Sequence, residues 1–171
     1  MVPTRMFVVG IGLAMIAAAC GGAAATSGGG GNANATVSMR QVAGVGNIYT
    51  DAQGMSLYTP AQEASGKILC TGSCTSVWIP LPPPGSGSPT KGSGVQGTLS
   101  IITRPDGTKQ VALNGAPLYR FYLDSTPGAV GGNGVMDSFA GVSFTWHVEA
   151  GSPVTAPTGS SGYGSGGGYG H

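Results

Sequence analysis

The chain has 171 residues, of which 33 are glycine and only 8% are charged. Seven Lys/Arg stand against six Asp/Glu, and removal of an N-terminal segment containing Arg5 leaves six of each. No basic stripe is present, which excludes the electrostatic basis for nucleic-acid binding and for strong attraction to anionic lipid headgroups.

Residues 1–19 have the pattern of a secretory signal, with Arg5, an apolar run over 6–16 and then small residues. The run is too short for a stable membrane-spanning helix. It ends in Ala-Ala-Ala-Cys-Gly at 17–21, which is similar to a lipobox. We expect Cys20 to carry lipid; the alternative is ordinary signal cleavage with Cys20 unmodified. Lipid would anchor the protein in the cell envelope, on the extracytoplasmic side of a bacterial membrane (periplasm or cell surface).

The rest of the chain divides by composition into three parts. Residues 20–35 hold the lipidated cysteine and a Gly/Ala/Ser tether, which lacks the apolar surface needed to order itself. Residues 36–150 are long enough for one domain with its own core. Residues 151–171 are a Gly/Ser/Tyr tail that we expect to be disordered, although its two tyrosines suggest weak attachment to a glycan or another surface as an alternative.

The domain lacks helical periodicity and contains 17 of the glycines, which disfavours long helices. Short strand patterns bounded by turn signals recur instead. They predict an all-β fold, a small antiparallel sandwich or barrel-like domain. The expected strands cover residues 37–42, 47–50, 55–59, 76–81, 98–104, 109–113, 116–123 and 142–149, with long loops over 85–97 and 124–141.

The stretch 114–124 is the richest in information. Asn114-Gly115 provides two residues that tolerate positive φ, as a two-residue hairpin turn requires. In the strand that follows, alternation places Tyr119 and Phe121 on one face and Tyr122 on the other. Aromatics on both faces predict a strand inside a sheet.

Part of this element occurs earlier in the chain. Gly54-x-x-Leu-Tyr58 corresponds to Gly115-x-x-Leu-Tyr119, and each copy is followed by one tryptophan, Trp78 or Trp146. We interpret the domain as two degenerate β repeats, neither able to bury its apolar face alone.

The second copy resembles predicted bacterial lipoproteins called secreted repeats of unknown function, which carry Tyr-x-(Phe/Trp/Tyr)-x-x-Asp. Tyr119, Phe121 and Asp124 match this motif. The first copy has Pro60 at the aromatic position and Glu63 at the aspartate position, so a symmetric pair of sites is not expected.

The resemblance covers roughly residues 42–151. It also includes Cys70-x-Gly-x-Cys74 followed by Trp78-x-Pro, the 104–107 turn (Arg-Pro-Asp-Gly) with Gln110, and the closing Trp146 and Gly151.

Cys70 and Cys74 form an even pair in an exported domain, which predicts a disulfide. Closing so small a loop stabilises by about 2 kcal/mol in the chain-entropy model. A redox-active dithiol is the alternative, without a Lys-rich or His-rich context to lower a thiol pKa. Metal binding is the other, but zinc needs two more ligands and the domain has one histidine, His147.

The aromatic residues have two interpretations. Most are expected to fill the core, together with Tyr119 and Phe121. If exposed, they would instead provide a platform for a glycan, quinone or hydrocarbon-like ligand. The possible platform residues are Tyr58, Trp78, Tyr122 and Trp146.

No catalytic residue is predicted. His147 alternates with Trp146 on the last strand and has no nucleophile motif beside it. The 124–137 loop offers Asp124, Asn133 and Asp137 as oxygen ligands for calcium, but not at EF-hand spacing. We expect Asp124 and Asn133 to hold turns through side-chain to backbone bonds, and predict no metal and no cofactor.

These patterns predict a lipid-anchored envelope lipoprotein of unknown activity, a non-catalytic binding or structural module. Its partner would be an envelope component or a small apolar or aromatic ligand. The alternative is a redox or electron-transfer accessory that uses Cys70 and Cys74. A lipid-anchored enzyme is the weakest interpretation.

Overall fold

The computed structural model describes residues 34–152. The predicted signal segment, Cys20 and the tail from 153 onward lie outside these residues. Within the described part, no helix is both long and apolar enough to cross a membrane.

The described chain is almost entirely β, as predicted. Two single-turn helices, η1 (Ala61–Glu63) and α1 (Cys74–Val77), interrupt the strands. The strands are β1 (Val37–Val42), β2 (Gly46–Asp51), β3 (Tyr58–Pro60), β4 (Trp78–Pro80), β5 (Leu99–Thr103), β6 (Lys109–Leu113), β7 (Ala116–Pro117), β8 (Tyr119–Phe121), β9 (Met136–Phe139) and β10 (Val142–Val148).

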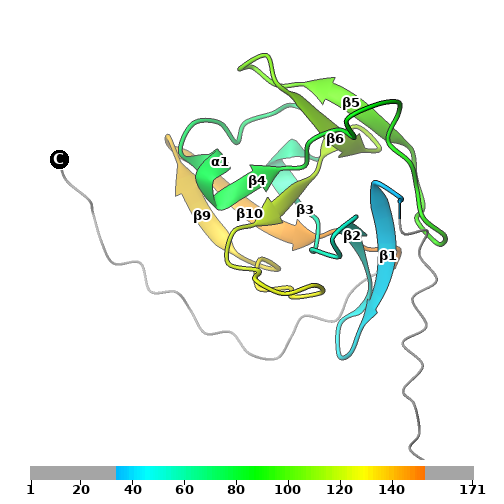
Figure 1. The fold of residues 1–171 in the computed structure, drawn as a ribbon. Helices are drawn as coiled ribbons and strands as arrows, with labels where there is room; N and C mark the ends of the chain where they lie inside the picture. Colours follow the sequence, from blue (N-terminus) through cyan, green and yellow to red (C-terminus); the bar gives the residue numbers. More distant parts are fainter. Residues whose placement is uncertain (1–33, 153–171) are drawn as a thin grey trace, which may run out of the picture.

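The strands form three antiparallel sheets (Figure 1). The largest has the order β4-β8-β3-β10-β9, and two smaller ones are β1-β2 and β5-β6-β7. Within residues 34–152 the sheets do not close into a barrel. β8 lies between β4 and β3, which confirms the expectation of an interior strand.

Backbone bonding repeats between the two halves of the domain. Three backbone bonds around the β1-β2 hairpin have counterparts around β5-β6. Around β1-β2, the N–H groups of Leu57, Tyr49 and Glu149 donate to the carbonyls of Tyr49 (3.0 Å), Glu149 (2.7 Å) and Leu57 (2.8 Å), respectively. Around β5-β6, the N–H groups of Leu118, Val111 and Leu81 donate to the carbonyls of Val111 (3.0 Å), Leu81 (2.9 Å) and Leu118 (2.9 Å). The two copies therefore face each other across an approximate two-fold relation, as the repeat hypothesis requires.

The last strand of each copy pairs with the other copy. β4, from the first copy, pairs with β8, placing Trp78 opposite Phe121. β10, from the second copy, pairs with β3, placing Trp146 opposite Pro60. Because each half completes the other's sheet, neither half buries its apolar face alone.

Two clusters of buried side chains fill the domain. The aromatic cluster lies on the large sheet and consists of Val45, Ile48, Tyr58, Cys70, Cys74, Trp78, Tyr119, Phe121, Phe144, Trp146 and Val148. The aliphatic cluster lies between the small sheets and consists of Val37, Tyr49, Leu57, Leu81, Val95, Val111, Leu113 and Leu118.

Three details differ from the predicted strands. The 76–81 segment begins in α1, and only its second half is a strand. The 116–123 segment is broken at Leu118, whose N–H and C=O bond Val111 and Leu81 as the chain passes between sheets. β9 lies within the predicted 124–141 loop and turns into β10 through Ala140 and Gly141, both at positive φ.

Candidate functional site

Two tyrosines exchange hydrogen bonds between the copies at the centre of the domain. Tyr58 and Tyr119 are cross-strand partners on β3 and β8. The Tyr58 hydroxyl donates to Asp124 Oδ2 at 2.5 Å, and the Tyr119 hydroxyl donates to Glu63 Oε2 at 2.7 Å. The tyrosine–carboxylate bond is therefore present in both copies, which was not expected, because the longer side chain of Glu63 serves as the counterpart of Asp124.

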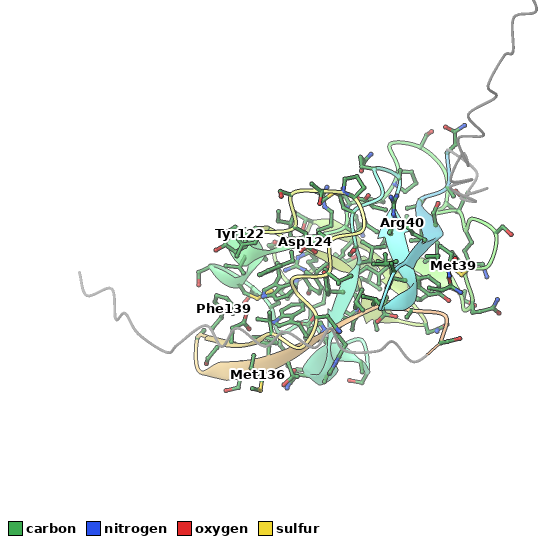
Figure 2. The ribbon with its side chains drawn as sticks, turned by 90° about the horizontal axis from the view of Figure 1, so that it is seen from below. Met39, Arg40, Tyr122, Asp124, Met136 and Phe139 are labelled. Carbon is green, nitrogen blue, oxygen red and sulfur yellow. A yellow bond between two sulfur atoms is a disulfide. The ribbon has the colours of Figure 1, made fainter. Side chains whose placement is uncertain are left out.

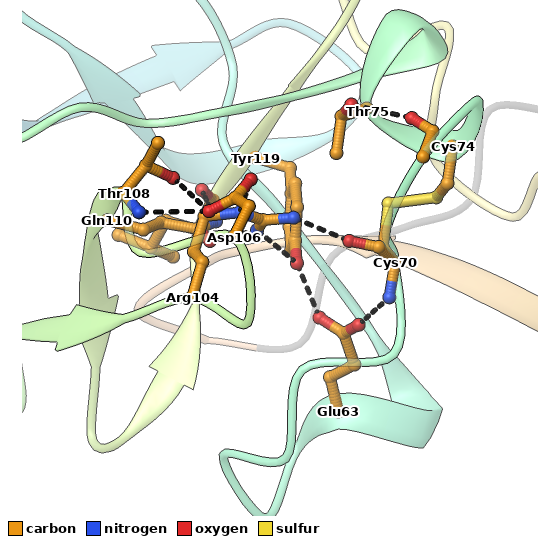
Figure 3. A network of polar contacts seen from close by, with 11 residues as sticks. Glu63, Cys70, Cys74, Thr75, Arg104, Asp106, Thr108, Gln110 and Tyr119 are labelled. Carbon is orange, nitrogen blue, oxygen red and sulfur yellow. Dashed lines mark hydrogen bonds and ion pairs between the residues drawn. A yellow bond between two sulfur atoms is a disulfide. The ribbon is translucent and has the colours of Figure 1, made fainter.

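Glu63 is fully buried and its carboxylate is well supplied with donors. Its Oε2 atom accepts the Tyr119 hydroxyl, and its Oε1 atom accepts the Cys70 N–H (Figure 3). Oε1 also accepts the Leu69 N–H at 2.5 Å. This carboxylate therefore fixes the segment that leads into the disulfide.

Arg104 supplies a buried positive charge to the same network. Its side chain comes from the end of β5, and the residue is only 3% exposed. Nη2 donates to the Cys70 carbonyl at 2.6 Å, and Nη1 donates to the Tyr119 hydroxyl at 3.2 Å and to Gln110 Oε1 (Figure 3). Arg104 thus reaches the Glu63 carboxylate through one tyrosine hydroxyl.

Asp124 has fewer donors and no such cation. Its Oδ1 atom accepts the Gly131 N–H at 2.9 Å, in addition to the Tyr58 hydroxyl on Oδ2. The side-chain to backbone bond expected for Asp124 is thus made with Gly131, seven residues along the chain. A Cβ at Gly132 would lie about 3 Å from both Trp78 and Tyr58. Only glycine there lets the loop approach the two rings this closely.

Burial sets the protonation of these groups. It raises the pKa of Tyr58, with the Asp124 hydrogen bond as the next cause. It also raises the pKa of Tyr119, where the Glu63 charge adds to the increase and Arg104 opposes it. Burial raises the pKa of Asp124 as well, against the bonds from Tyr58 and Gly131. Both tyrosines are protonated donors at neutral pH.

Asp137 holds the two tryptophans together. The Trp78 and Trp146 rings stack with centroids 3.8 Å apart and an interplanar angle of 8°. Each indole N–H donates to one oxygen of Asp137, at 2.7 Å from Trp78 and 2.9 Å from Trp146. Each tryptophan also meets the tyrosine of its own copy edge-on, Tyr58 or Tyr119.

Cys70 and Cys74 are disulfide-bonded, with Cα atoms 5.3 Å apart. Both residues have no exposed surface. A redox accessory would need a pair that a partner can reach, so the burial argues against that alternative.

The suggested ligand platform is not assembled at the surface. Tyr58, Trp78 and Trp146 have no exposed area, and of the four only Tyr122 is open, at 53% and on the rim of the molecule (Figure 2). His147 is also exposed, on the face of β10 opposite Trp146.

The oxygen groups suggested for calcium serve other partners. Asp124 binds Tyr58 and Asp137 binds the tryptophans, while Asn133 Oδ1 accepts the Val148 N–H at 3.1 Å. Among residues 34–152, His, Cys, Asp and Glu side chains do not gather in groups of three that could hold a metal.

A surface cavity of about 250 Å³ lies away from this network. Arg120 and Asp51 form an ion pair in its wall, 3.4 Å from Nη1 to Oδ2. The Arg120 Nε is buried without a hydrogen-bond partner. The remaining wall is made by Asn34, Ala35, Thr36, Ala52, Gln53, Leu81, Pro82, Pro83 and Pro84.

The sequence did not predict that Glu63, Arg104 and Asp137 hold buried tyrosine and tryptophan side chains through hydrogen bonds. Only 8% of the residues are charged, so a charged residue next to the end of an expected strand indicates a buried polar network. Glu63 already stood at the acidic position of the first copy. Nothing in the local pattern around Asp137 marks it as the acceptor for two distant indoles.

Comparison with known proteins gives a family match, and it lies in the second copy. Residues 100–148 match a family model described as a secreted repeat of unknown function. The matched span runs from β5 to β10 and includes Arg104, Tyr119, Asp124 and Trp146. No curated protein and no solved structure matches the chain. The chain thus contains a segment similar to a secreted repeat, which indicates an exported protein.

Proposed function

We propose that this protein is a lipid-anchored module of the bacterial cell envelope that binds a partner or a small ligand and catalyses no reaction. Three features support the proposal: the lipobox-like sequence ending at Cys20, the similarity to a secreted repeat, and a buried polar network whose carboxylates accept hydrogen bonds from tyrosine hydroxyls and backbone N–H groups.

The observation that carries the non-catalytic role is the burial of the tyrosines and carboxylates that exchange hydrogen bonds between the two copies. Tyr58, Tyr119 and Glu63 have no exposed area, and Asp124 is only 7% exposed. A general acid or base must reach the proton it transfers. Here the acidic groups are occupied by tyrosine hydroxyls and backbone N–H groups, which is what a structural carboxylate requires.

The cavity beside Arg120 supports a binding role. Its wall combines the partly exposed side chain of Arg120 with the apolar rings of Pro82, Pro83 and Pro84. Such a site suits a small ligand with one acceptor group and an apolar body. Because Asp51 already balances the charge of Arg120, a neutral acceptor fits the site better than a strongly acidic one.

Replacing Asp124 tests the non-catalytic role. Asp124→Ala leaves the Tyr58 hydroxyl and the Gly131 N–H without their acceptor, so we expect the free energy of unfolding to fall by about 1–3 kcal/mol. Denaturant unfolding of variant and wild type measures the loss. Unchanged stability would favour a ligand-binding or catalytic carboxylate.

Replacing Cys20 tests the anchor. We expect Cys20→Ala to accumulate as an unprocessed precursor or to be released in soluble form, because the acylated residue is gone. Membrane fractionation and intact-mass measurement detect both outcomes. Ala17→Leu, which brings the segment closer to a common lipobox, is the matched control and should stay in the membrane fraction. Membrane attachment of Cys20→Ala after ordinary cleavage at another site would refute the anchor.

A further inference from the structure

Among residues 34–152, a backbone segment pairs with the outer edge of β1, whereas none pairs with the outer edge of β5. A segment after β4 runs beside β1, where the Val37 N–H donates to the Thr90 carbonyl at 3.1 Å and the Gly92 N–H donates back to the Val37 carbonyl at 2.8 Å. This pairing is a parallel bridge between Val37 and Lys91.

The corresponding backbone groups of β5 point outward. The Asn114 N–H donates to the Thr98 carbonyl at 2.8 Å, so Thr98 directs its carbonyl toward β6. In an antiparallel pair the next residue directs both backbone groups the other way. Leu99 faces Leu113 in the register and is therefore the counterpart of Val37, with N–H and C=O toward the outer edge.

An apolar side chain is also left open on β5. Ile101 occupies the position that Met39 has on β1 and is 42% exposed. Met39 is partly buried, and Gly94 lies against it so closely that a Cβ at Gly94 would collide with the Met39 side chain. The cover over Met39 thus comes from the segment that runs beside β1.

The chain contains a second segment of the same kind. Counting from the paired tryptophans, Trp78 and Trp146, the covering segment 88–95 (Ser-Pro-Thr-Lys-Gly-Ser-Gly-Val) corresponds to 156–163 (Ala-Pro-Thr-Gly-Ser-Ser-Gly-Tyr). Four of the eight residues are identical, at the offset of 68 that separates the tryptophans. The length of chain needed to reach the edge is the same in both copies.

From these observations we infer that residues 156–163 dock on the outer edge of β5 as a parallel strand. The Thr158 carbonyl accepts the Leu99 N–H, and the Ser160 N–H donates to the Leu99 carbonyl. Gly162 covers Ile101, and Tyr163 takes the place that the buried Val95 has in the first copy. Both partners are uncharged, so no ion is desolvated when the edge is closed.

This inference replaces the expectation of a wholly disordered tail and is independent of the proposed anchor and ligand. The docked segment would complete the second copy as 88–95 completes the first. It would also remove an uncharged edge strand, Leu-Ser-Ile-Ile-Thr, that is otherwise a template for pairing between molecules.

Amide hydrogen exchange of Leu99, followed by NMR, tests the inference. We compare the full chain, the same chain ending at Ser152, and Ser160→Pro, which lacks the donor to Leu99. The Leu99 amide should exchange about tenfold faster in the shortened chain, where its Thr158 acceptor is missing. The same increase is expected in Ser160→Pro, because loss of the adjacent bond to the Leu99 carbonyl undocks the segment that carries Thr158. Ser165→Pro, beyond the docked residues, is the matched control and should leave the rate unchanged.

The Val37 amide is the internal standard, because its acceptor Thr90 is present in every variant. It should keep the same exchange rate throughout, which shows that the domain remains folded. Equal Leu99 exchange in the full and shortened chains would overturn the inference. So would protection of Leu99 that survives shortening and rises with protein concentration, because a second molecule would then occupy the edge.

Discussion

Glu63 and Asp124 occupy equivalent places in the two copies, and each accepts the hydroxyl of the other copy's tyrosine. Their surroundings differ. Glu63 is fully buried, accepts two backbone N–H groups and has Arg104 one hydroxyl away. Asp124 lies nearer the surface, accepts one backbone N–H and has no cation in its network. Both copies therefore have the tyrosine–carboxylate hydrogen bond, but only the Glu63 carboxylate has a buried cation, Arg104, in its network.

The tyrosine and carboxylate positions of the motif are common to the two copies, so the fold needs these positions in both. The tyrosine–carboxylate exchange ties each copy to the other beside their shared strand pair, so both copies retain it. The aromatic position differs, since Phe121 stacks on Trp78 while its counterpart Pro60 faces Trp146. Compensation by a buried arginine is needed where the carboxylate is cut off from water, because an isolated buried charge is costly.

The largest expected effect is at the compensated site. Arg104→Met leaves the Cys70 carbonyl and Gln110 without their donor and the Glu63 charge without its cation. We expect the free energy of unfolding to fall by about 3–5 kcal/mol, as for one broken member of a buried ionic network. Denaturant unfolding measures it.

Arg120→Met is the matched control for Arg104→Met. Arg120 also pairs with a carboxylate, Asp51, but its side chain is 31% exposed. Solvent screening limits the expected loss to about 0–1 kcal/mol. Equal losses in the two variants would mean that burial does not distinguish the two arginines.

A smaller effect is expected from the titration of Asp124. Burial raises its folded pKa above the unfolded value of 3.8. The folded state therefore binds the proton more tightly, and this contribution to stability is full below the unfolded pKa and lost as pH rises through the folded pKa. Relative to Asp124→Asn, the wild type should lose stability as the pH increases from 3.8 through that window.

Measuring wild type and Asp124→Asn side by side isolates this carboxyl. The pKa of Glu149 is also raised by burial, but Glu149 titrates in both proteins and cancels in the difference. If the wild type instead gains stability relative to Asp124→Asn over the same pH range, the folded protein stabilises the ionised form of Asp124, as expected for a carboxylate paired with a cation.

Much of the fold was predictable because it depends on local signals. The Asn114-Gly115 turn has both residues at positive φ, 52° and 88°, as inferred from the dipeptide. Alternation predicted that Trp146 and His147 lie on opposite faces of the last strand, and on β10 Trp146 is buried while His147 is exposed. β9 was missed because Ala140-Gly141 is a weak hairpin signal, and alanine rarely adopts the positive φ that it has here.

The candidate site was less predictable because it depends on long-range pairing. The motif residues indicated where the carboxylates would be, but not that each tyrosine would serve the other copy. That exchange follows from the pairing of Tyr58 with Tyr119, 61 residues apart. Arg104 was assigned to a turn, since a buried arginine is rare and its hydrogen-bond partners, Cys70, Gln110 and Tyr119, come from three separate segments.

A double-mutant cycle tests the exchange between copies most directly. Tyr58→Phe and Asp124→Asn, made singly and together, report the coupling across the copies; Tyr58→Phe with Glu63→Gln reports the coupling within one copy. The reciprocal exchange predicts a coupling free energy of at least about 1 kcal/mol for Tyr58 with Asp124, and a clearly smaller value for Tyr58 with Glu63. Equal couplings, or a larger one for Tyr58 with Glu63, would contradict the exchange on which the two-copy architecture is built.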